Sequence, residues 1–212
     1  MRTGCNLQKA VYSPYNKSKE FNLEIATNKT KVFGFVGKDH LRAEIIIKDK
    51  ILEQVNQFTY LGCSLSYQCS NDVEFKLAKF LQLIGTIKKT IFKKVRTETV
   101  LKLYNTLILP TFLYGSENWT LTASQRRRIE AAEMKLLRPL AGYTLYDHKT
   151  NNSIRKELRI TSILDKIDEY RKKWLLHIHR MPQNRIPLKS YNCRPQGRRS
   201  IGRPKERWRE QL

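Results

Sequence analysis

The sequence predicts an α+β protein in which a small antiparallel β region is followed by helices and a basic C-terminal tail. Three observations lead to this prediction. Between about residues 21 and 62 the chain has several short β-type runs, the first of which alternates apolar and polar residues as half-buried strands do. From residue 71 the apolar residues recur every three or four positions, as on one face of a helix. After Pro182, prolines and glycines interrupt any long helix while lysines and arginines accumulate.

The strand predictions begin after an N-terminal segment, residues 1–20, which has no clear period and is expected to be irregular. The β-type runs cover residues 21–25, 31–36, 44–48 and 51–60. The first of them is also compatible with a helix-to-strand junction. The fourth run should end at Leu61-Gly62, with inward-facing side chains at Val55, Phe58 and Tyr60.

A long helix is predicted to start at Asn71, with Glu74 placed to complete a capping box. Its apolar residues recur at alternating steps of four and three, so they should form a seam that faces other helices. The seam consists of Val73, Leu77, Phe80, Ile84, Ile87 and Ile91. The opposite face should carry Lys76, Lys79, Lys88, Lys89, Lys93 and Lys94.

A second helix should be capped by Thr97, with Glu98 in its first turn, and should end at Pro110. One side of this helix carries Val100, Tyr104 and Leu107. An aromatic linker, residues 111–119, is expected to follow. Aromatic residues beside apolar stripes usually belong to the core, so Phe112 and Trp119 are predicted to be buried, whereas Tyr114 could pack or stack on a base.

Three more helices are predicted before the tail. The first is capped by Thr122 and Gln125 and stops at Gly142, and a short one covers residues 153–158. The last is capped by Thr161 and ends at Pro182. Their apolar stripes are Ile129, Ala132, Leu136 and Leu140, and then Ile163, Ile167, Tyr170, Trp174 and Ile178.

The charge of the chain indicates a polyanionic partner. Its 41 Lys and Arg face 19 Asp and Glu, which gives a formal net charge of +22. Nucleic acid is the commonest partner of such a protein, and an acidic membrane surface is the alternative. No run approaches the roughly 20 apolar residues that span a bilayer, and the N-terminus lacks an apolar signal core. We therefore expect an intracellular protein, nuclear or cytoplasmic, that does not use a membrane.

Catalytic and metal-binding patterns are weak. The four cysteines form no CxxC pair, so reduced thiols and no zinc site are expected. The four histidines have no recognisable nucleophile setting, which argues against a hydrolase. Asp165 and Asp168 are one helical turn apart, but Lys166 and Arg171 lie close by, so a solvated helix face is favoured over a metal site.

Short sequence motifs occur along the chain in the order in which one known protein family has them. The early ones are Asn22-Leu23-Glu24-Ile25, Asn28-Lys29-Thr30-Lys31 and Phe58-Thr59-Tyr60-Leu61-Gly62. The central ones are Leu103-Tyr104, Leu109-Pro110 and Leu113-Tyr114-Gly115-Ser116-Glu117-Asn118-Trp119. The late ones are Arg180-Met181, Arg185-Ile186-Pro187 and Gly202-Arg203-Pro204-Lys205-Glu206-Arg207-Trp208.

From about residue 20 to its end, the chain thereby resembles the C-terminal third of the endonuclease–reverse transcriptase of RTE-like non-LTR retrotransposons. The early motifs resemble the end of the palm (motif D) and the primer-grip hairpin, the central ones the thumb, and the late ones the basic C-terminus. One position departs from the family pattern, because Leu176 stands where the family has Gly before His177.

The resemblance implies a domain order and an activity. Residues 21–62 would be a palm and primer-grip remnant, 63–145 a helical thumb, 146–182 C-terminal helices and 183–212 a basic, partly disordered tail. The family is an RNA-directed DNA polymerase whose reaction uses two metal ions held by paired carboxylates. This chain has no adjacent Asp pair, so the fragment is expected to be inactive alone, with no catalytic residue and no cofactor; only an intact polymerase would need Mg²⁺.

The expected partner is therefore RNA or an RNA–DNA primer-template, with a full-length polymerase of the same element as a second partner. Motif D would place Lys29 near the nucleotide, although an exposed strand-edge lysine is the favoured interpretation. The other nucleic-acid-binding candidates are Tyr60, Gly62, Lys76, Lys79, Lys88, Lys89, Tyr114, Arg203, Lys205, Arg207, Trp208 and Arg209. Trp208 could stack on a base among the tail arginines or dock the tail onto the thumb.

Two other functions remain open from the sequence. The chain could be the product of a decayed transposon gene, whose charge is inherited without a role. It could also be a domesticated scaffold whose helices bind a protein partner.

Overall fold

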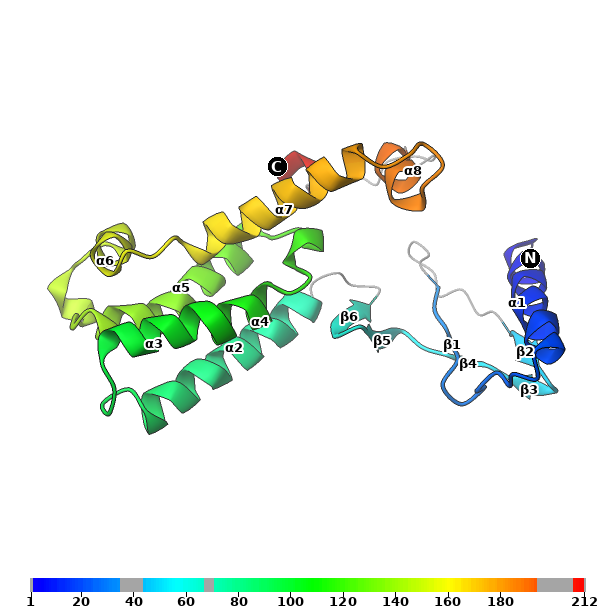
Figure 1. The fold of residues 1–212 in the computed structure, drawn as a ribbon, viewed down its shortest axis with the longest axis horizontal. Coiled ribbons are helices and arrows are strands. Elements are labelled where there is room, and N and C mark those ends of the chain that lie inside the picture. Colours follow the sequence, from blue (N-terminus) through cyan, green and yellow to red (C-terminus); the bar gives the residue numbers. More distant parts are fainter. Residues whose placement is uncertain (1, 35–43, 67–70, 194–207, 212) are drawn as a thin grey trace. The chain divides into compact units, whose positions relative to one another are not determined.

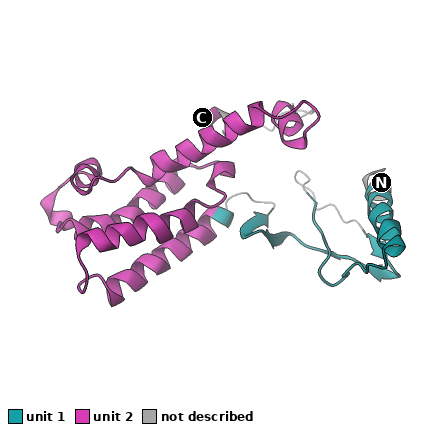
Figure 2. Cartoon of the chain, in the orientation of Figure 1, with its two compact units in different colours: residues 1–72 teal, residues 73–212 magenta. Residues whose placement is uncertain are grey.

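A computed structural model describes residues 2–34, 44–66, 71–193 and 208–211 (Figure 1). The chain divides into two compact units (Figure 2). Residues 1–72 form the N-terminal unit, and residues 73–212 form the helical unit.

The N-terminal unit begins with helix α1, Arg2–Glu20, where an irregular segment was predicted. Tertiary contacts explain the difference, because Val11 and Tyr15, four residues apart, pack against a small core. That core consists of Val32, Ile45, Ile47 and Leu52. The Gln8 side chain also exchanges two hydrogen bonds with the backbone of Ile46, at 2.8 and 3.0 Å. The residues of α1 that face the core can be recognised only from the residues that they contact in the structure.

Among the described residues, three two-stranded ladders replace the single antiparallel set that was predicted. Strands β1 (Lys31–Val32) and β4 (Glu53–Gln54) pair in parallel. Strands β2 (Ile46–Ile47) and β3 (Lys50–Ile51) pair antiparallel. The predicted first run, residues 21–25, is not a strand, because Phe21 is 72% exposed and the chain turns there.

The longest of these ladders is the hairpin of β5 (Gln57–Tyr60) and β6 (Cys63–Ser66). Its two-residue loop is Leu61-Gly62, and both residues have positive φ, 47° and 77°, as a type I′ turn requires. Tyr60 was expected to face inward but is exposed, whereas Phe58 is half-buried and meets the Phe33 ring edge-on, with centroids 5.4 Å apart.

The helical unit is built on α2 (Asn71–Thr90), whose predicted apolar seam is confirmed. Val73, Leu77, Phe80, Ile84 and Ile87 are all buried, and Ile91 packs against them. Beside α2 runs a second helical stretch, made of α3 (Thr97–Leu103), the π-helical turn η1 (Tyr104–Ile108) and α4 (Leu109–Leu113) (Figure 1).

Pro110 does not end this stretch, contrary to the prediction. The backbone N–H of Leu109 bonds to the carbonyl of Tyr104 five residues earlier, which is the wide turn of a π-helix. Pro110 then falls in the first turn of α4, where its missing N–H costs little. The extra residue also shifts the buried face, so Ile108 is in the core and the predicted Leu107 is exposed.

The remaining elements complete the core and extend it. They are η2 (Ser116–Asn118), α5 (Ala123–Leu140), η3 (Leu145–Asp147), α6 (Asn151–Leu158), α7 (Ile163–His179), α8 (Ile186–Asn192) and η4 (Trp208–Gln211). The capping box of Thr122 and Gln125 is confirmed, with hydrogen bonds of 2.9 and 3.2 Å. Helix α5 stops before Gly142, whose φ of 80° confirms its role. Helix α8, which follows Pro182, was not predicted.

Along the described ranges, no helix combines the length and the apolar character that crossing a membrane requires.

Candidate nucleic-acid interface

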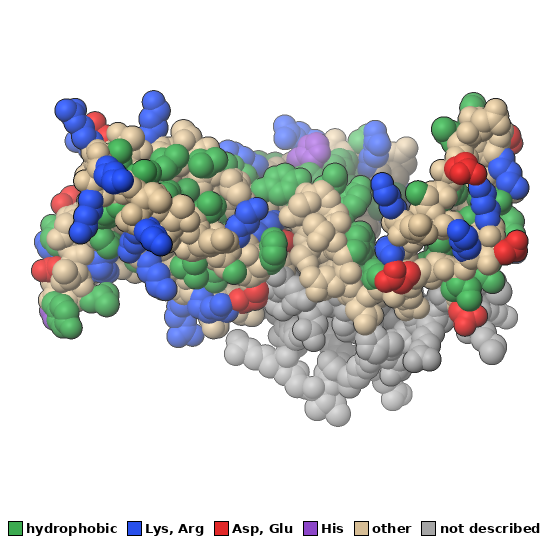
Figure 3. Space-filling view, turned by 90° about the horizontal axis from the view of Figure 1, so that it is seen from below, with side chains coloured by type: hydrophobic (Ala, Val, Ile, Leu, Met, Phe, Trp, Pro, Cys, Tyr) green, Lys and Arg blue, Asp and Glu red, His purple; other side chains and the backbone are tan. Residues whose placement is uncertain are grey.

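Positive charge is concentrated in the helical unit. Its residues 73–212 contain 31 Lys and Arg and 12 Asp and Glu, a formal net charge of +19. The N-terminal unit contains 10 Lys and Arg and 7 Asp and Glu, a net charge of +3. In Figure 3, blue side chains spread over the helical unit with few red ones among them. A phosphate backbone is therefore attracted mainly to the helical unit.

Several lysines gather at the C-terminal end of α2. Lys88 and Lys89 lie in its last turn, Lys93 and Lys94 follow it, and Lys135 of α5 is close enough for its charge to act on Lys88. Partial burial, and next the charge of Lys135, lower the pKa of Lys88. We call these five exposed residues the lysine cluster.

The lysine cluster has little acidic compensation. Within the part of the chain that the structure describes, no carboxylate forms an ion pair with any of its five ammonium groups. Lysines in a last turn also stabilise the negative end of the helix dipole, which is a structural role for Lys88 and Lys89. That role does not account for Lys93, Lys94 and Lys135, so the cluster remains suited to a polyanion.

Lys76 is not on the exposed lysine face, contrary to the prediction. Its side chain is buried, and its Nζ donates a hydrogen bond to the backbone carbonyl of Tyr114. The ammonium also lies 5.4 Å from the ring centroid of Trp119 and 5.6 Å from that of Tyr114. Lys76 thus satisfies a carbonyl at the end of α4 and is not available to a phosphate. Lys79, three residues further on, is exposed as predicted.

The aromatic linker divides as its two interpretations suggested. Phe112 and Trp119 are confirmed as core residues, with ring centroids 5.4 Å apart. Tyr114 is 54% exposed. Gly115, with a φ of 75°, reverses the chain between α4 and η2.

Three predicted site residues lie in the N-terminal unit. Lys29 is exposed, as expected, but it lies in a turn rather than at the edge of a strand. Tyr60 is exposed on the β5–β6 hairpin, and Gly62 is in its turn. The hairpin presents the ring of Tyr60 to solvent.

Trp208 docks onto the helical unit in this structure, as the docking interpretation of this residue predicts, and its stacking on a base stays a prediction. Its indole Nε1 donates a 2.6 Å hydrogen bond to the carbonyl of Glu117. Its own carbonyl accepts a 2.9 Å hydrogen bond from Nη2 of Arg171, and the Arg171 guanidinium lies 5.8 Å from the ring centroid. The Tyr191 ring meets the indole edge-on.

The other binding candidates in the C-terminal tail are not described by the structure. Arg203, Lys205 and Arg207 lie outside the described residues, and so does the side chain of Arg209. Their part in nucleic-acid binding stays a prediction.

The aspartates of α7 pair with arginines. Asp168 accepts a 2.6 Å hydrogen bond from Nη2 of Arg126 and lies 3.4 Å from Arg171. Asp165, one turn earlier, is exposed. Because Arg126 and the buried Arg171 occupy the Asp168 carboxylate, a partly buried ion-pair cluster describes this position better than a metal site.

The sequence analysis did not predict a buried polar network around Glu133. Glu133 of α5 is fully buried and accepts hydrogen bonds from Arg155 (2.8 Å), from the Tyr104 hydroxyl (3.0 Å) and from the backbone N–H of Ile163 (3.1 Å). A signal was present, because an acid four residues after Ile129 falls on the apolar stripe of α5. The network joins four helical segments, η1, α5, α6 and α7.

Comparisons with known proteins indicate where this chain comes from. No protein-family model matches the chain, and no solved structure does. The chain is similar to an uncharacterized transposon-derived protein of Caenorhabditis elegans, with 27% identity over 217 residues. The alignment covers 92% of this chain and 74% of the relative. Similarity over nearly the whole chain supports a transposon origin for this protein.

Proposed function

We propose that this chain is the C-terminal part of a non-LTR retrotransposon reverse transcriptase and that it binds RNA or an RNA–DNA primer-template. The observation that carries the proposal is the charge of the helical unit, +19, with a lysine cluster that no described carboxylate compensates. The motif order and the transposon-derived relative support the same origin. Helices with cationic faces hold a nucleic-acid backbone through phosphate contacts, which give affinity without sequence preference.

Polymerisation is not part of the proposal for the chain alone. The sequence contains no adjacent Asp pair, and Asp168 is engaged by two arginines. Two metal ions held by carboxylates are what the reaction requires. A full-length polymerase of the same element would have to supply them, with this chain as a binding partner on the same template.

The test is a salt titration of the full chain on single-stranded RNA and on an RNA–DNA hybrid. Each phosphate contact contributes roughly 0.7 to 0.9 to the slope of log affinity against log salt. The triple variant Lys88→Gln, Lys89→Gln, Lys93→Gln should therefore reduce that slope by about two to three. A flat salt dependence of the unmodified chain would end the proposal.

The matched control removes three lysines from the N-terminal unit. Lys9, Lys17 and Lys50 are exposed, so their replacement by Gln changes the total charge equally. The slope should fall less in this control. An equal fall in both triple variants would mean that binding follows net charge and not the lysine cluster.

A further inference from the structure

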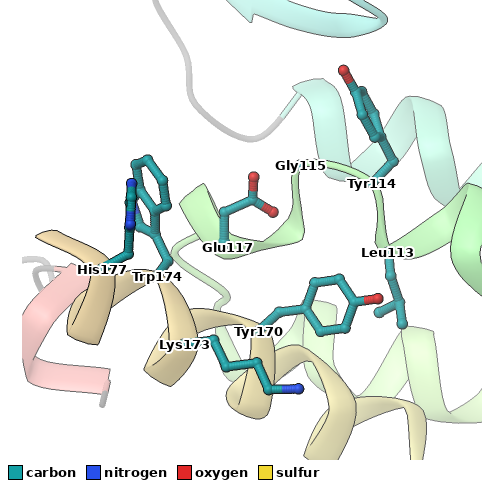
Figure 4. A pocket seen from close by; sticks show the side chains of 8 residues that line it. All are labelled: Leu113, Tyr114, Gly115, Glu117, Tyr170, Lys173, Trp174 and His177. Carbon is teal, nitrogen blue, oxygen red and sulfur yellow. The ribbon is translucent and has the colours of Figure 1, made fainter.

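An open pocket of about 590 Å³ lies between α7 and the segment that joins α4 to η2 (Figure 4). It belongs wholly to the helical unit. Its size is within the range of about 300 to 1,000 Å³ that is usual for sites of small organic groups. The walls are mainly aromatic, and they contain Tyr114, Tyr170, Trp174 and His177, with Lys173 and Glu117.

The aromatic side chains of α7 are more accessible than their sequence pattern predicts. Tyr170 and Trp174 continue the apolar stripe of Ile163 and Ile167, which are fully buried. Yet Tyr170 is 40% exposed and Trp174 is only half-buried. The Trp174 and His177 rings are inclined at 34° with centroids 5.3 Å apart, which makes a broad aromatic wall. Rings that face open space offer a stacking surface that the core does not use.

The polar groups of the pocket suit a nucleotide. Lys173 is exposed at its edge, and its 2.5 Å ion pair with Glu169 raises the pKa of Lys173, so the ammonium stays charged. Such an exposed pair can exchange its carboxylate for a phosphate at little cost, because exposed ion pairs contribute little free energy. Glu117, on the opposite wall in Figure 4, is a hydrogen-bond acceptor that suits the amino or imino edge of a base.

We infer that this pocket holds one unstacked base of a single-stranded nucleic acid, with the neighbouring phosphate at Lys173. The inference rests on the proposed function and names a site within it. Aromatic rings beside cationic groups are what single strands bind, because every base has a face that can stack. The +19 charge of the same unit draws the strand to this surface. An aromatic side chain of a protein partner is the other occupant that the walls could accept.

The experiment compares two fluorescein-labelled strands of equal length and equal phosphate number, an oligouridylate and an abasic oligoribose phosphate. A base in the pocket should make the oligouridylate bind about five- to 150-fold more tightly than the abasic strand. Trp174→Leu and Tyr170→Leu should each reduce this ratio toward one. Neither substitution removes a charge, so neither should change the affinity for the abasic strand or the salt slope.

The control is Tyr146→Leu, which removes an aromatic ring that is 90% exposed and lies outside the pocket. Its ratio of oligouridylate affinity to abasic-strand affinity should equal that of the unmodified chain. Circular dichroism checks that each variant is folded. If Trp174→Leu unfolds the protein, Trp174→Phe is used instead. The oligouridylate should then quench tryptophan fluorescence more in the unmodified chain than in Trp174→Phe, and the difference is the quenching of Trp174.

The outcomes separate the inference from the proposed function. Equal ratios in the unmodified chain, Trp174→Leu and Tyr170→Leu overturn the base site, and a steep salt dependence in all of them leaves the proposed function standing. Failure of both strands to bind overturns both. Unchanged ratios together with capture of a folded protein partner that Trp174→Leu abolishes would assign the pocket to a protein side chain.

Discussion

Glu133 of α5 and Arg155 of α6 form an ion pair of 2.8 Å whose side chains are 0% and 7% exposed. Both oxygens of the carboxylate are used, one by Arg155 and the other by Tyr104 and the backbone of Ile163. Arg155 also reaches Glu130, at 3.0 Å. A buried charge is tolerated only with such complete pairing, so this network fixes how α5, α6 and the start of α7 meet.

Arg155→Met should destabilise the protein strongly. The substitution keeps much of the aliphatic volume but leaves the Glu133 carboxylate buried without its cation, a change that costs about 3 to 5 kcal/mol. Urea denaturation followed by circular dichroism measures the free energy of unfolding. Arg127→Met removes an exposed arginine of the same helix bundle and should change that free energy by less than about 0.5 kcal/mol. Similar midpoints for the two variants would show that the pair is not a structural requirement.

Tyr104 should make the stability fall at high pH. Burial, and next the charge of Glu133, raise the pKa of Tyr104 in the folded protein above its ordinary value of 10.0. Above pH 10 the unfolded chain loses the phenolic proton of Tyr104 while the folded chain keeps it. The free energy of unfolding therefore falls by up to about 1.4 kcal/mol per pH unit. Below pH 10 this contribution to stability is fully present.

The measurement is urea denaturation at a series of pH values from neutral to strongly basic. Tyr104→Phe has no phenolic proton, so its stability should decline less steeply above pH 10 than that of the unmodified chain. Tyr146→Phe, at a side chain that is 90% exposed, should follow the unmodified chain. Identical declines for all three proteins would contradict a buried, protonated Tyr104.

The helical unit was predictable where one periodic pattern dominated. The seam of α2 and the capping box of α5 depend on residues three or four apart, so the sequence shows them directly. The strand ladders were less predictable, because β1 to β4 have only two residues each and their pairing depends on α1 and on distant chain segments. The π-helical turn at Tyr104 likewise changes which residues of the helix face the core, and no local sequence pattern predicts it.

The candidate site was predicted in part. Runs of lysines gave the cationic end of α2, but the burial of Lys76 depends on a carbonyl 38 residues away and has no local sequence signal. The aromatic pocket was not predicted, because the spacing of Tyr170 and Trp174 is also that of core residues. Only the tertiary structure shows that these two rings are partly exposed.

Ile84→Asp should unfold the helical unit. Ile84 lies in the middle of the α2 seam and is 3% exposed, so the substitution places a charge among apolar side chains at a cost of several kcal/mol. Thermal melting by circular dichroism measures the effect. Gly85→Ala is the neighbouring control. A Cβ at Gly85 would meet no atom within 4 Å, so alanine should stabilise this helix interior by about 0.5 to 1 kcal/mol. An unchanged melting curve for Ile84→Asp would show that the phase of α2 is wrong.

Trp208→Ala should lower the melting temperature and leave nucleic-acid affinity nearly unchanged. The indole connects the carbonyl of Glu117 at η2 to Arg171 of α7, so its loss removes a hydrogen bond and a cation–π contact at once. A loss of about 1 to 3 kcal/mol is expected, and each kcal/mol corresponds to roughly 2 to 4 °C for a protein of this size. The Trp208 carbonyl remains in the variant, so Arg171 keeps that acceptor.

Trp208→Phe separates the two contributions, because it keeps an aromatic ring beside Arg171 but cannot donate a hydrogen bond to Glu117. It should recover part of the melting temperature and remain about 0.5 to 1.5 kcal/mol less stable than the unmodified chain. Affinity for single-stranded RNA, measured at constant salt on all three proteins, should agree within about twofold, because no phosphate contact is removed. A variant that melts normally but binds RNA more weakly would mean that Trp208 leaves its docked position and stacks on a base, and the docked contacts would then describe only the free protein.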